Sequence, residues 1–244
     1  PATTGSYSYK AEYSGDSNYN GSTGTCEPVT IVNARITIGN TAVNALGIPH
    51  TFTITVEKDT GSAWTGISGL YPVVTFTPSA PGTVTDNCNL TGTNGSGQCT
   101  VVVNSAVAGV FTTNASANVN VNSVPFSLAT NSVAPNSGPA VKTYVDANIQ
   151  ITPGTATNRI NTPHPLTLHV NVNPGNGFVN APDGTIINAA IQSGPGSLSA
   201  PSCTTSGGTG SCQVTLNSSV SGTTVVRGSV TVVVNTVSLN RATA

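Results

Sequence analysis

The sequence predicts an all-β protein made of tandem β-sandwich modules, and three observations support this. Apolar and polar residues alternate over short runs such as TFTITV and PLTLHV, which places one face of a strand on a core and the other in water. Clusters rich in Gly, Pro and Asn, such as PGNG and GTNGSG, separate the runs. The two halves of the chain also share one pattern, which indicates a repeated module.

The repeat is visible in three pairs of segments. ARITI (34–38) aligns with ANIQI (147–151), LGIPHTFTITV (46–56) with INTPHPLTLHV (160–170), and GQCTVVVNS (97–105) with GSCQVTLNS (210–218). The offset is 147 − 34 = 113 positions at the first pair and 164 − 50 = 114 at the two PH dipeptides. We therefore predict one module at 33–130 and another at 147–244, joined by a linker and first-strand segment at 131–146.

Each module contains about seven short strands in roughly 100 residues, which is typical of a two-sheet sandwich of the immunoglobulin type. The Cys…Trp…Cys core of antibody domains is absent, because Trp64 lies in the stretch KDTGSAWTGISG, which is expected to be a loop. The predicted fold class is thus all-β, with tandem immunoglobulin-like β-sandwich modules in a rod-like array.

Residues 1–32 are predicted to be the C-terminal strands of an incomplete module. TTGSYSYKAEY (3–13) aligns its Gly5 with Gly109 and Gly222, where the closing strands of the full modules begin. A lone two-stranded hairpin is marginal in water and leaves unpaired edges. The missing strands come either from a longer chain, which we favour, or from a neighbouring subunit by strand addition.

Composition excludes several functions. Charged residues make up 6% of the chain, with Lys+Arg 7 and Asp+Glu 8, so no basic surface for nucleic acid is expected. No window approaches 18 consecutive apolar residues, so we predict no membrane insertion. Methionine is absent even at position 1, which indicates a mature or excised fragment. The high content of Asn, Thr, Ser and Gly fits an extracellular surface.

Four of the five cysteines form two close pairs, Cys88 with Cys99 and Cys203 with Cys212. A thiolate metal site needs shorter spacing and four soft ligands. We therefore predict two disulfides, each across the mouth of a hairpin between adjacent strands, in an oxidising compartment. Cys26 has no local partner and is expected to be unpaired or to form an intermolecular bond.

These segments resemble a known family. YKAEYSGDSNYNGSTGTCEPVTI (9–31) resembles the closing strands of bacterial Ig-like repeats in large surface proteins, and the two modules resemble Ig-like or prealbumin-like repeats of bacterial cell-surface and secreted fibre proteins. The resemblance implies an extracellular or bacterial cell-surface location. It also implies a role as a stalk, an adhesin spacer or a filament subunit.

The stretch DSNYNGSTGTCE matches a calcium-loop pattern, with Asp16, Asn18, Asn20 and Glu27 as candidate ligands. The loop of an EF-hand lies between two helices, whereas here both flanks are strand-like. We favour an Asx-rich turn over a weak calcium site.

His50 and His164 occupy matching positions, and neither module supplies a repeated Ser-His-Asp or Cys-His set. We expect each ring to pack at the end of a sandwich, and His169 to lie on a strand surface. No catalytic residue, cofactor or enzyme activity is predicted.

The three lysines, Lys10, Lys58 and Lys142, do not occupy matching repeat positions. Some bacterial surface sandwiches contain a Lys to Asn amide bond in an apolar site. For this chain we instead expect exposed strand or linker lysines.

The predicted function is therefore structural: an Ig-like repeat segment of an extracellular rod, stalk or filament. Assembly by strand complementation is one of the two arrangements above, and a longer chain is the favoured one. Its expected partners are further modules of the same chain or other copies of it. The alternative is an adhesin or carbohydrate-binding surface module, with a glycan as partner and Trp64 as the best candidate for a ligand platform.

Overall fold

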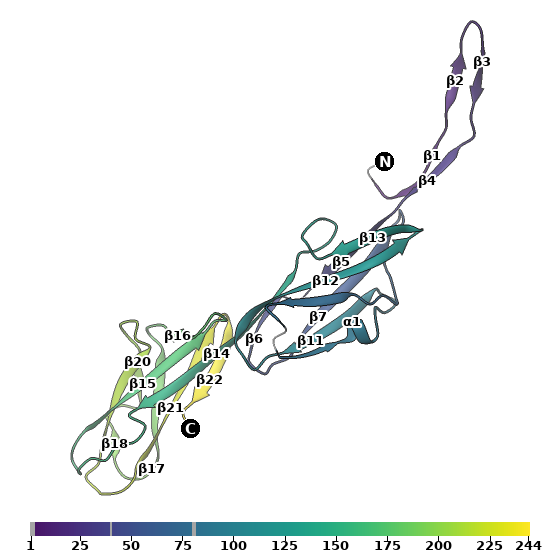
Figure 1. Ribbon diagram of the computed structural model, residues 1–244. Helices are drawn as coiled ribbons and strands as arrows, with labels where there is room; N and C mark the ends of the chain where they lie inside the picture. Colours follow the sequence, from purple (N-terminus) through teal and green to yellow (C-terminus); the bar gives the residue numbers. More distant parts are fainter. Residues whose placement is uncertain (1–2, 40, 80–81) are drawn as a thin grey trace. The chain divides into compact units, whose positions relative to one another are not determined.

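The computed structural model describes residues 3–39, 41–79 and 82–244, and strands make up most of its regular structure (Figure 1). One short helix, α1 (Asn87–Leu90), lies in the described part. No helix within these ranges is long and apolar enough to cross a membrane. The predicted all-β class is confirmed.

The chain divides into two compact units whose segments interleave in the sequence. Unit 1 contains residues up to 41, then 50–103 and 111–141. Unit 2 contains 42–49, 104–110 and 142–244. These two units are defined by which residues contact one another, not by the sequence repeat. The module boundaries predicted above, 1–32, 33–130, 131–146 and 147–244, therefore stay predictions.

Unit 1 is a sandwich of two sheets. Its core includes Ile36, Ile54 and Val101 from one sheet and Val119 and Leu128 from the other, all in one buried cluster. The first sheet has the order β10 (Thr83–Asp86), β11 (Gln98–Asn104), β7 (His50–Asp59), β5 (Asn33–Ile38), with β8 (Trp64–Gly66) beside β7. The second contains β9 (Val73–Thr77), β12 (Gly109–Val121) and β13 (Val124–Ala129).

Unit 2 repeats this construction, with a core that includes Ile149, Leu168, Val214, Val230 and Leu239. One sheet has the order β14 (Ala140–Thr152), β15 (His164–Asn173), β20 (Ser211–Asn217), β18 (Ser197–Leu198), with β16 (Val179–Asn180) beside β15 and β6 (Ala42–Ala45) beside β14. The other has the order β19 (Ser202–Thr204), β17 (Ile186–Ser193), β21 (Val225–Val234), β22 (Val237–Ala242).

The sequence repeat is also a structural repeat. One cross-strand pair of side chains is charged in unit 1 and neutral in unit 2, in keeping with the low content of charged residues. Arg35 of β5 lies opposite Glu57 of β7, and their side chains form an ion pair with Nε and Oε2 2.7 Å apart. The equivalent residues of unit 2 are Asn148 and Asn171, which are also opposite each other, and the Asn171 amide donates to Asn148 at 3.2 Å. A neutral amide pair therefore occupies the place of an ion pair.

The N-terminal segment forms a two-stranded ribbon. β1 (Gly5–Tyr9) pairs with β4 (Glu27–Ile31), and β2 (Glu12–Gly15) pairs with β3 (Asn20–Thr23). The expected long first strand is therefore interrupted at residues 10–11. No other strand in the described part of the chain pairs with this ribbon.

Lys142 corrects the expectation of an exposed lysine. Its side chain is completely buried on β14, and its Nζ lies 4.8 Å from the centroid of the Tyr144 ring. Within the described residues the Nζ has no hydrogen-bond partner. The run AVKTYVD alternates as a strand does, but which neighbours cover Lys142 depends on tertiary packing. Burial lowers the pKa of Lys142 to about 8 and raises the pKa of Tyr144 to about 12.

We predict that the folded protein becomes more stable as pH rises from 8 to 10. The unfolded chain keeps the Lys142 proton up to about its ordinary pKa of 10.5, whereas the folded chain releases it near 8. The free energy of unfolding should therefore increase by about 2 to 3 kcal/mol over this window. Below pH 8 both states hold the proton, and this contribution is flat.

Urea unfolding at several pH values checks this, in a Cys26→Ser background so that no free thiol exchanges with the disulfides. Lys142→Met removes the buried charge, and should be more stable than the parent at pH 7 and lack the rise. Above pH 10 the raised pKa of Tyr144 opposes the gain, because the unfolded chain ionises first. The same rise in Lys142→Met would contradict the assignment to Lys142.

Candidate binding groove in unit 2

A groove of two adjoining hollows lies at one end of unit 2, and we call them the first and second hollow. Their volumes are about 350 and 690 Å³. The loop at 153–163, between β14 and β15, and the loop at 218–224, between β20 and β21, provide most of the walls. Residues shared by both hollows are Ala156, His164, Leu216, Thr223 and Thr224.

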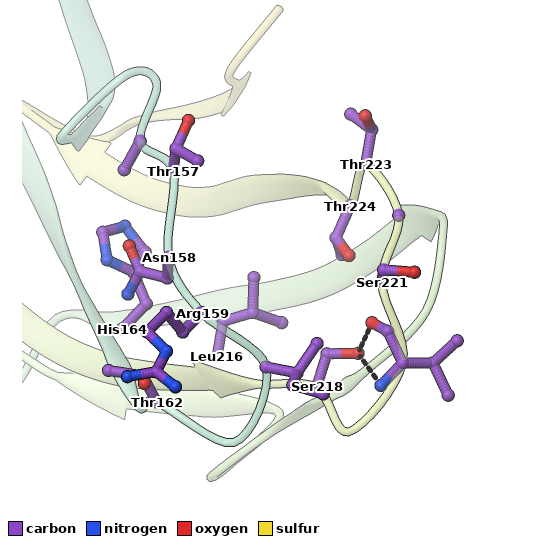
Figure 2. A pocket seen from close by; sticks show the side chains of 14 residues that line it. Thr157, Asn158, Arg159, Thr162, His164, Leu216, Ser218, Ser221, Thr223 and Thr224 are labelled. Carbon is purple, nitrogen blue, oxygen red and sulfur yellow. Dashed lines mark hydrogen bonds between the residues drawn. The ribbon is translucent and has the colours of Figure 1, made fainter.

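Two kinds of hydrogen bond hold the first hollow together: Ser218 side chain to main chain, which Figure 2 shows, and main chain to main chain between the loops. The Ser218 hydroxyl donates to the carbonyl of Val220 at 2.7 Å and accepts from the amide of Val220 at 3.2 Å. The amide of Asn161 donates to the carbonyl of Ser218 at 2.7 Å, which ties one loop to the other. The walls are therefore positioned by the local sequence of both loops.

The first hollow is lined by polar and apolar side chains in similar measure and has one cation, Arg159. Arg159 is exposed on the 153–163 loop next to Thr162, and Thr157 and the half-buried ring of His164 line the same hollow (Figure 2). No Asp or Glu side chain lines either hollow in the described part of the chain. The groove can thus bind an extended polar segment or an anionic group.

The second hollow has a more apolar floor. Ile149 and Ile151 of β14 lie beneath it, and Val225 and Val226 of β21 line it as well. The segment Ala242–Ala244 also lines this hollow. A chain that continues from Ala244 would enter the groove directly.

The sequence prediction did not single out this groove. The available signal was the comparison of 41–50 (TAVNALGIPH) with 155–164 (TATNRINTPH), two equivalent loops in which Arg159 stands where the first repeat has Ala45.

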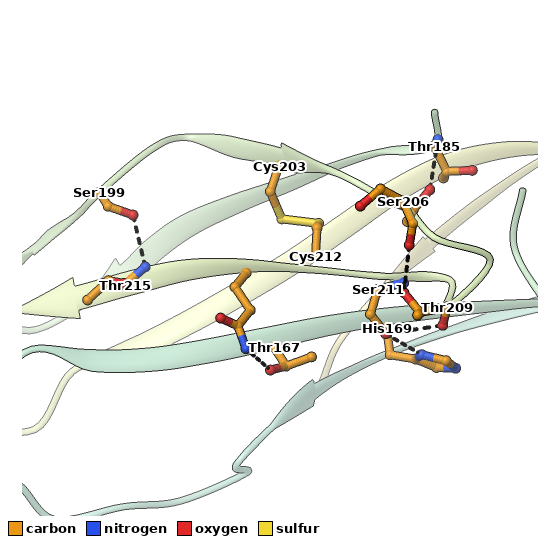
Figure 3. Close-up of a disulfide and its surroundings, with 12 residues drawn as sticks. Thr167, His169, Thr185, Ser199, Cys203, Ser206, Thr209, Ser211, Cys212 and Thr215 are labelled. Carbon is orange, nitrogen blue, oxygen red and sulfur yellow. Dashed lines mark hydrogen bonds between the residues drawn. A yellow bond between two sulfur atoms is a disulfide. The ribbon is translucent and has the colours of Figure 1, made fainter. Parts of the chain in front are cut away.

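Both predicted disulfides form, but not between adjacent strands of a hairpin. Cys203 lies on β19 and Cys212 on β20, which belong to different sheets of unit 2 (Figure 3). Their Cα atoms are 5.7 Å apart. The bond therefore links the two sheets of the sandwich.

The other disulfide joins Cys88, which is in α1, to Cys99 on β11, with Cα atoms 5.0 Å apart. The carboxylate of Asp86 caps the helix by accepting from the amide of Asn89 at 3.0 Å. The spacing predicted the pairing, but the helix that contains Cys88 was missed because it is only one turn long. Cys26 is free and exposed.

The calcium-loop candidates do not converge. Asp16 lies at the tip of the ribbon, where one carboxylate oxygen accepts from the amides of Asn18 at 2.8 Å and Tyr19 at 2.9 Å. The other oxygen accepts from the Tyr13 hydroxyl at 2.7 Å, and these bonds lower the pKa of Asp16. Asn20 pairs with Gly15, whereas Glu27 pairs with Tyr9 beyond the β2–β3 pair.

The arrangement around Asp16 is an Asx turn. No group of three or more His, Cys, Asp or Glu side chains suited to a metal ion occurs in the described residues.

The sequence predicted that Trp64 lies in a loop, and this is wrong. Trp64 is the first residue of the edge strand β8 and lies opposite Asp59. Its ring is half-buried, and the guanidinium carbon of Arg35 lies 4.3 Å from the ring centroid. Arg35 thus occupies one face of the ring through a cation–π contact. Binding of a sugar to that face would have to displace it.

The three histidines differ in what their rings contact. The ring of His50 packs edge-on against Phe52, with centroids 4.7 Å apart. One ring nitrogen of His169 lies 2.7 Å from the Ser211 hydroxyl (Figure 3), and the other lies 2.9 Å from the side-chain oxygen of Asn171. Among the three, His164 is the one that lines the groove.

No family model and no curated protein matches this sequence. Among solved structures, the chain is similar to the D00-D0 domain of intimin, with a TM-score of 0.45, 18% identity, and coverage of 84% of this chain and 96% of that one. It is also similar to the D0-D1 domain of intimin, with a TM-score of 0.28, 23% identity, and coverage of 84% and 94%. A third similarity is to FdeC, described as a broadly conserved Escherichia coli adhesin, with a TM-score of 0.39, 17% identity, and coverage of 89% and 67%.

We predict that each disulfide contributes similarly to stability. Cys88–Cys99 and Cys203–Cys212 close loops of similar length, with sequence separations of 11 and 9. In the chain-entropy approximation each should contribute about 2 to 3 kcal/mol. The double variants Cys88→Ser/Cys99→Ser and Cys203→Ser/Cys212→Ser, compared by urea unfolding, should both lose this amount.

Thiol labelling of the unreduced native protein is the control. One thiol per chain, Cys26, should react, and none should react in Cys26→Ser. Labelling of Cys88 or Cys203 would show that the bonds are not formed in the protein as isolated.

Proposed function

We propose that the chain is a segment of tandem immunoglobulin-like modules from an extracellular bacterial surface protein, where it serves as a structural spacer in a rod, stalk or filament. The observation that carries the proposal is the N-terminal ribbon, which has the features of the closing hairpin of a module but lacks the rest of its sandwich. The rod-like arrangement stays a prediction.

The ribbon exposes residues whose equivalents are buried in one full module and half-buried in the other. With Gly5 aligned to Gly109, Tyr9 corresponds to Thr113, and the two are 52% and 0% exposed. With Gly5 aligned to Gly222, Tyr13 corresponds to Val230, and the two are 43% and 3% exposed. An apolar strand face that is buried in one copy and open in another indicates missing neighbours.

The register of β1 and β4 places apolar residues of both strands on the same face of the ribbon. Tyr7 lies opposite Val29, and Gly5 lies opposite Ile31, so these residues share one face. Ser6 and Ser8 alternate with them and lie opposite Thr30 and Pro28. The ribbon is thus amphipathic, as a hairpin that covers a sandwich core is.

The paired strands needed to complete this module come from a preceding part of a longer chain or from a second subunit. The disulfides support a spacer role, because each fixes a part of its sandwich against local opening in an oxidising environment. The low charge and the polar, Asn- and Thr-rich surface fit the same setting.

The test compares residues 1–244 with residues 33–244. Every member of the two buried core clusters lies at residue 34 or beyond, so the shorter protein keeps both cores. It should be a folded monomer in sedimentation experiments. The full chain should assemble, or its residues 1–32 should be cleaved rapidly by protease.

A matched variant of the full chain, Tyr7→Thr with Val29→Thr, keeps β-propensity but removes the apolar face, and should be monomeric. A monomeric parent chain whose first 32 residues resist protease would contradict the incomplete-module proposal.

The second candidate function is adhesion through a glycan. The observation that favours it is the open groove with Arg159, His164 and several hydroxyl groups, which suits an acidic sugar. Trp64 is the alternative platform, and the bound Arg35 side chain makes it the weaker one.

A glycan array distinguishes these sites. Saturable binding that is lost in Arg159→Ala and kept in Trp64→Ala would support the groove, and the reverse would support Trp64. The spacer proposal predicts no saturable binding to any glycan. Folding of both variants is verified by thermal unfolding.

A further inference from the structure

Two equivalent loops of the repeat have different neighbours in the structure. We call 41–50 (TAVNALGIPH) the first-repeat loop and 155–164 (TATNRINTPH) the second-repeat loop; five of their ten positions carry the same residue. They precede equivalent strands, which begin at His50 and His164. Comparing them shows what the groove of unit 2 can hold.

The first-repeat loop holds a strand. Its residues Ala42–Ala45 form β6, which pairs in parallel with Lys142–Val145 of β14 within unit 2. Val43 and Ala45 pack against the buried core of this unit. The loop is positioned by the amide of Gly47, which donates to the carbonyl of Ser105 at 2.9 Å, and Ser105 is buried.

The second-repeat loop has the same construction without the strand. The amide of Asn161 donates to Ser218 as that of Gly47 does to Ser105. Ser218 also binds both main-chain groups of Val220, as Ser105 does with those of Val107. Residues 156–159 are nevertheless exposed, and Ser218 is half-buried where Ser105 is buried. No strand in the described part of the chain pairs with 156–159. This loop forms a wall of the first hollow.

The second hollow corresponds to a place that is filled in unit 1. There, the segment after Thr130 runs beside β5. The amide of Ile36 donates to the side-chain oxygen of Asn136 at 2.9 Å, the amide of Ile38 donates to the Ser137 hydroxyl at 3.0 Å, and the amide of Ser137 donates to the carbonyl of Ile36 at 3.1 Å.

The counterparts of Ile36 and Ile38 are Ile149 and Ile151, and they form the floor of the second hollow. The residue that leads the chain toward this position is held by the same hydrogen bond in both units. The Thr130 hydroxyl accepts from the amide of Ala115 at 3.0 Å, and that of Thr243 accepts from the amide of Gly228 at 3.1 Å. Unit 2 therefore has the geometry for a following linker, with the place beside β14 open.

We propose that the groove is the docking site of a further sandwich module of the same repeat. The linker of that module lies in the second hollow, where an Asn-Ser pair accepts from the amides of Ile149 and Ile151. Its first strand pairs in parallel with residues 156–159 in the first hollow. This inference rests on the proposed function as a tandem-module segment and specifies how one module is joined to the next.

The differences between the loops define the chemistry of the incoming strand. Thr157 replaces Val43 and Arg159 replaces Ala45, so the second-repeat loop is more polar and carries a cation. In the pairing of β6, Ala45 lies opposite Val145, and Asp146 follows. An incoming strand with an acidic residue at or next to the position of Val145 would complement Arg159.

The test extends the full chain at Ala244 with a copy of residues 132–244, because Ala244 is equivalent to Asn131. Amide hydrogen exchange is measured at Ile149, Ile151 and 156–159 of the original chain. In the extended protein these amides should exchange at least about tenfold more slowly than in residues 1–244 alone. Ile36, Ile38 and 42–45 of the same molecule provide the reference rates for occupied sites.

A matched extended protein carries Asn136→Ala and Ser137→Ala in the added copy only. Asn136 and Ser137 bond to β5 of the preceding module, and Ser137 otherwise bonds only to the adjacent carbonyl of Gly138 among the bonds described. The copy should therefore still fold, but Ile149 and Ile151 should return to fast exchange. The proposal is overturned if the added copy is folded, with its two disulfides formed, and the original amides keep the rates of the unextended chain.

In the unextended chain, amide exchange at these positions could instead become slower as protein concentration rises. That result would also overturn the proposal, because the occupant of the groove would then be a second copy of the chain. The result is separable from the test of the N-terminal ribbon. Failure at the groove, combined with assembly that requires residues 1–32, would leave the spacer function standing and remove only this docking site.

Discussion

The main-chain groups at the edges of a β-sandwich have to be paired or covered, and the rest of this structure depends on how the chain meets that requirement. In unit 1 the outer amides of β5 are satisfied by side chains of the following linker, at Asn136 and Ser137. In unit 2 the start of β14 is paired by β6. Each sandwich is thus completed by segments distant in sequence, and for this reason the two units interleave along the chain.

Burial of polar groups follows from the same construction. Lys142 lies in the part of β14 that pairs with β6, and its ammonium group has the Tyr144 ring as a neighbour but no hydrogen-bond partner among the described residues. A buried amine of this kind is costly unless it loses its proton, which is the reason for its lowered pKa. The pairing that closes the sheet edge therefore also makes the stability of the unit depend on pH.

Alternation, turn residues and the internal repeat were sufficient to predict the β-sandwiches and the cysteine pairs. They were not sufficient for features decided by packing between distant segments. Trp64 belongs to an edge strand because β7 provides a partner, and Cys203 lies on the opposite sheet from Cys212 because β19 pairs with β17. The groove was missed because its walls are two loops without a chemical motif, brought together by one main-chain hydrogen bond from Asn161 to Ser218.

The two repeats share the hydrogen bonds that position their loops but differ in the side chains that an incoming strand would meet. Hydrogen bonds that place the loops involve main-chain groups and a conserved pattern of serine and threonine hydroxyls, so they persist when other side chains change. The positions that face an incoming strand differ, with Thr157 and Arg159 in place of Val43 and Ala45. A tandem protein that used identical contacts at every junction could join its modules in any order. Because this junction carries a charge that the other lacks, the same fold can select which module follows.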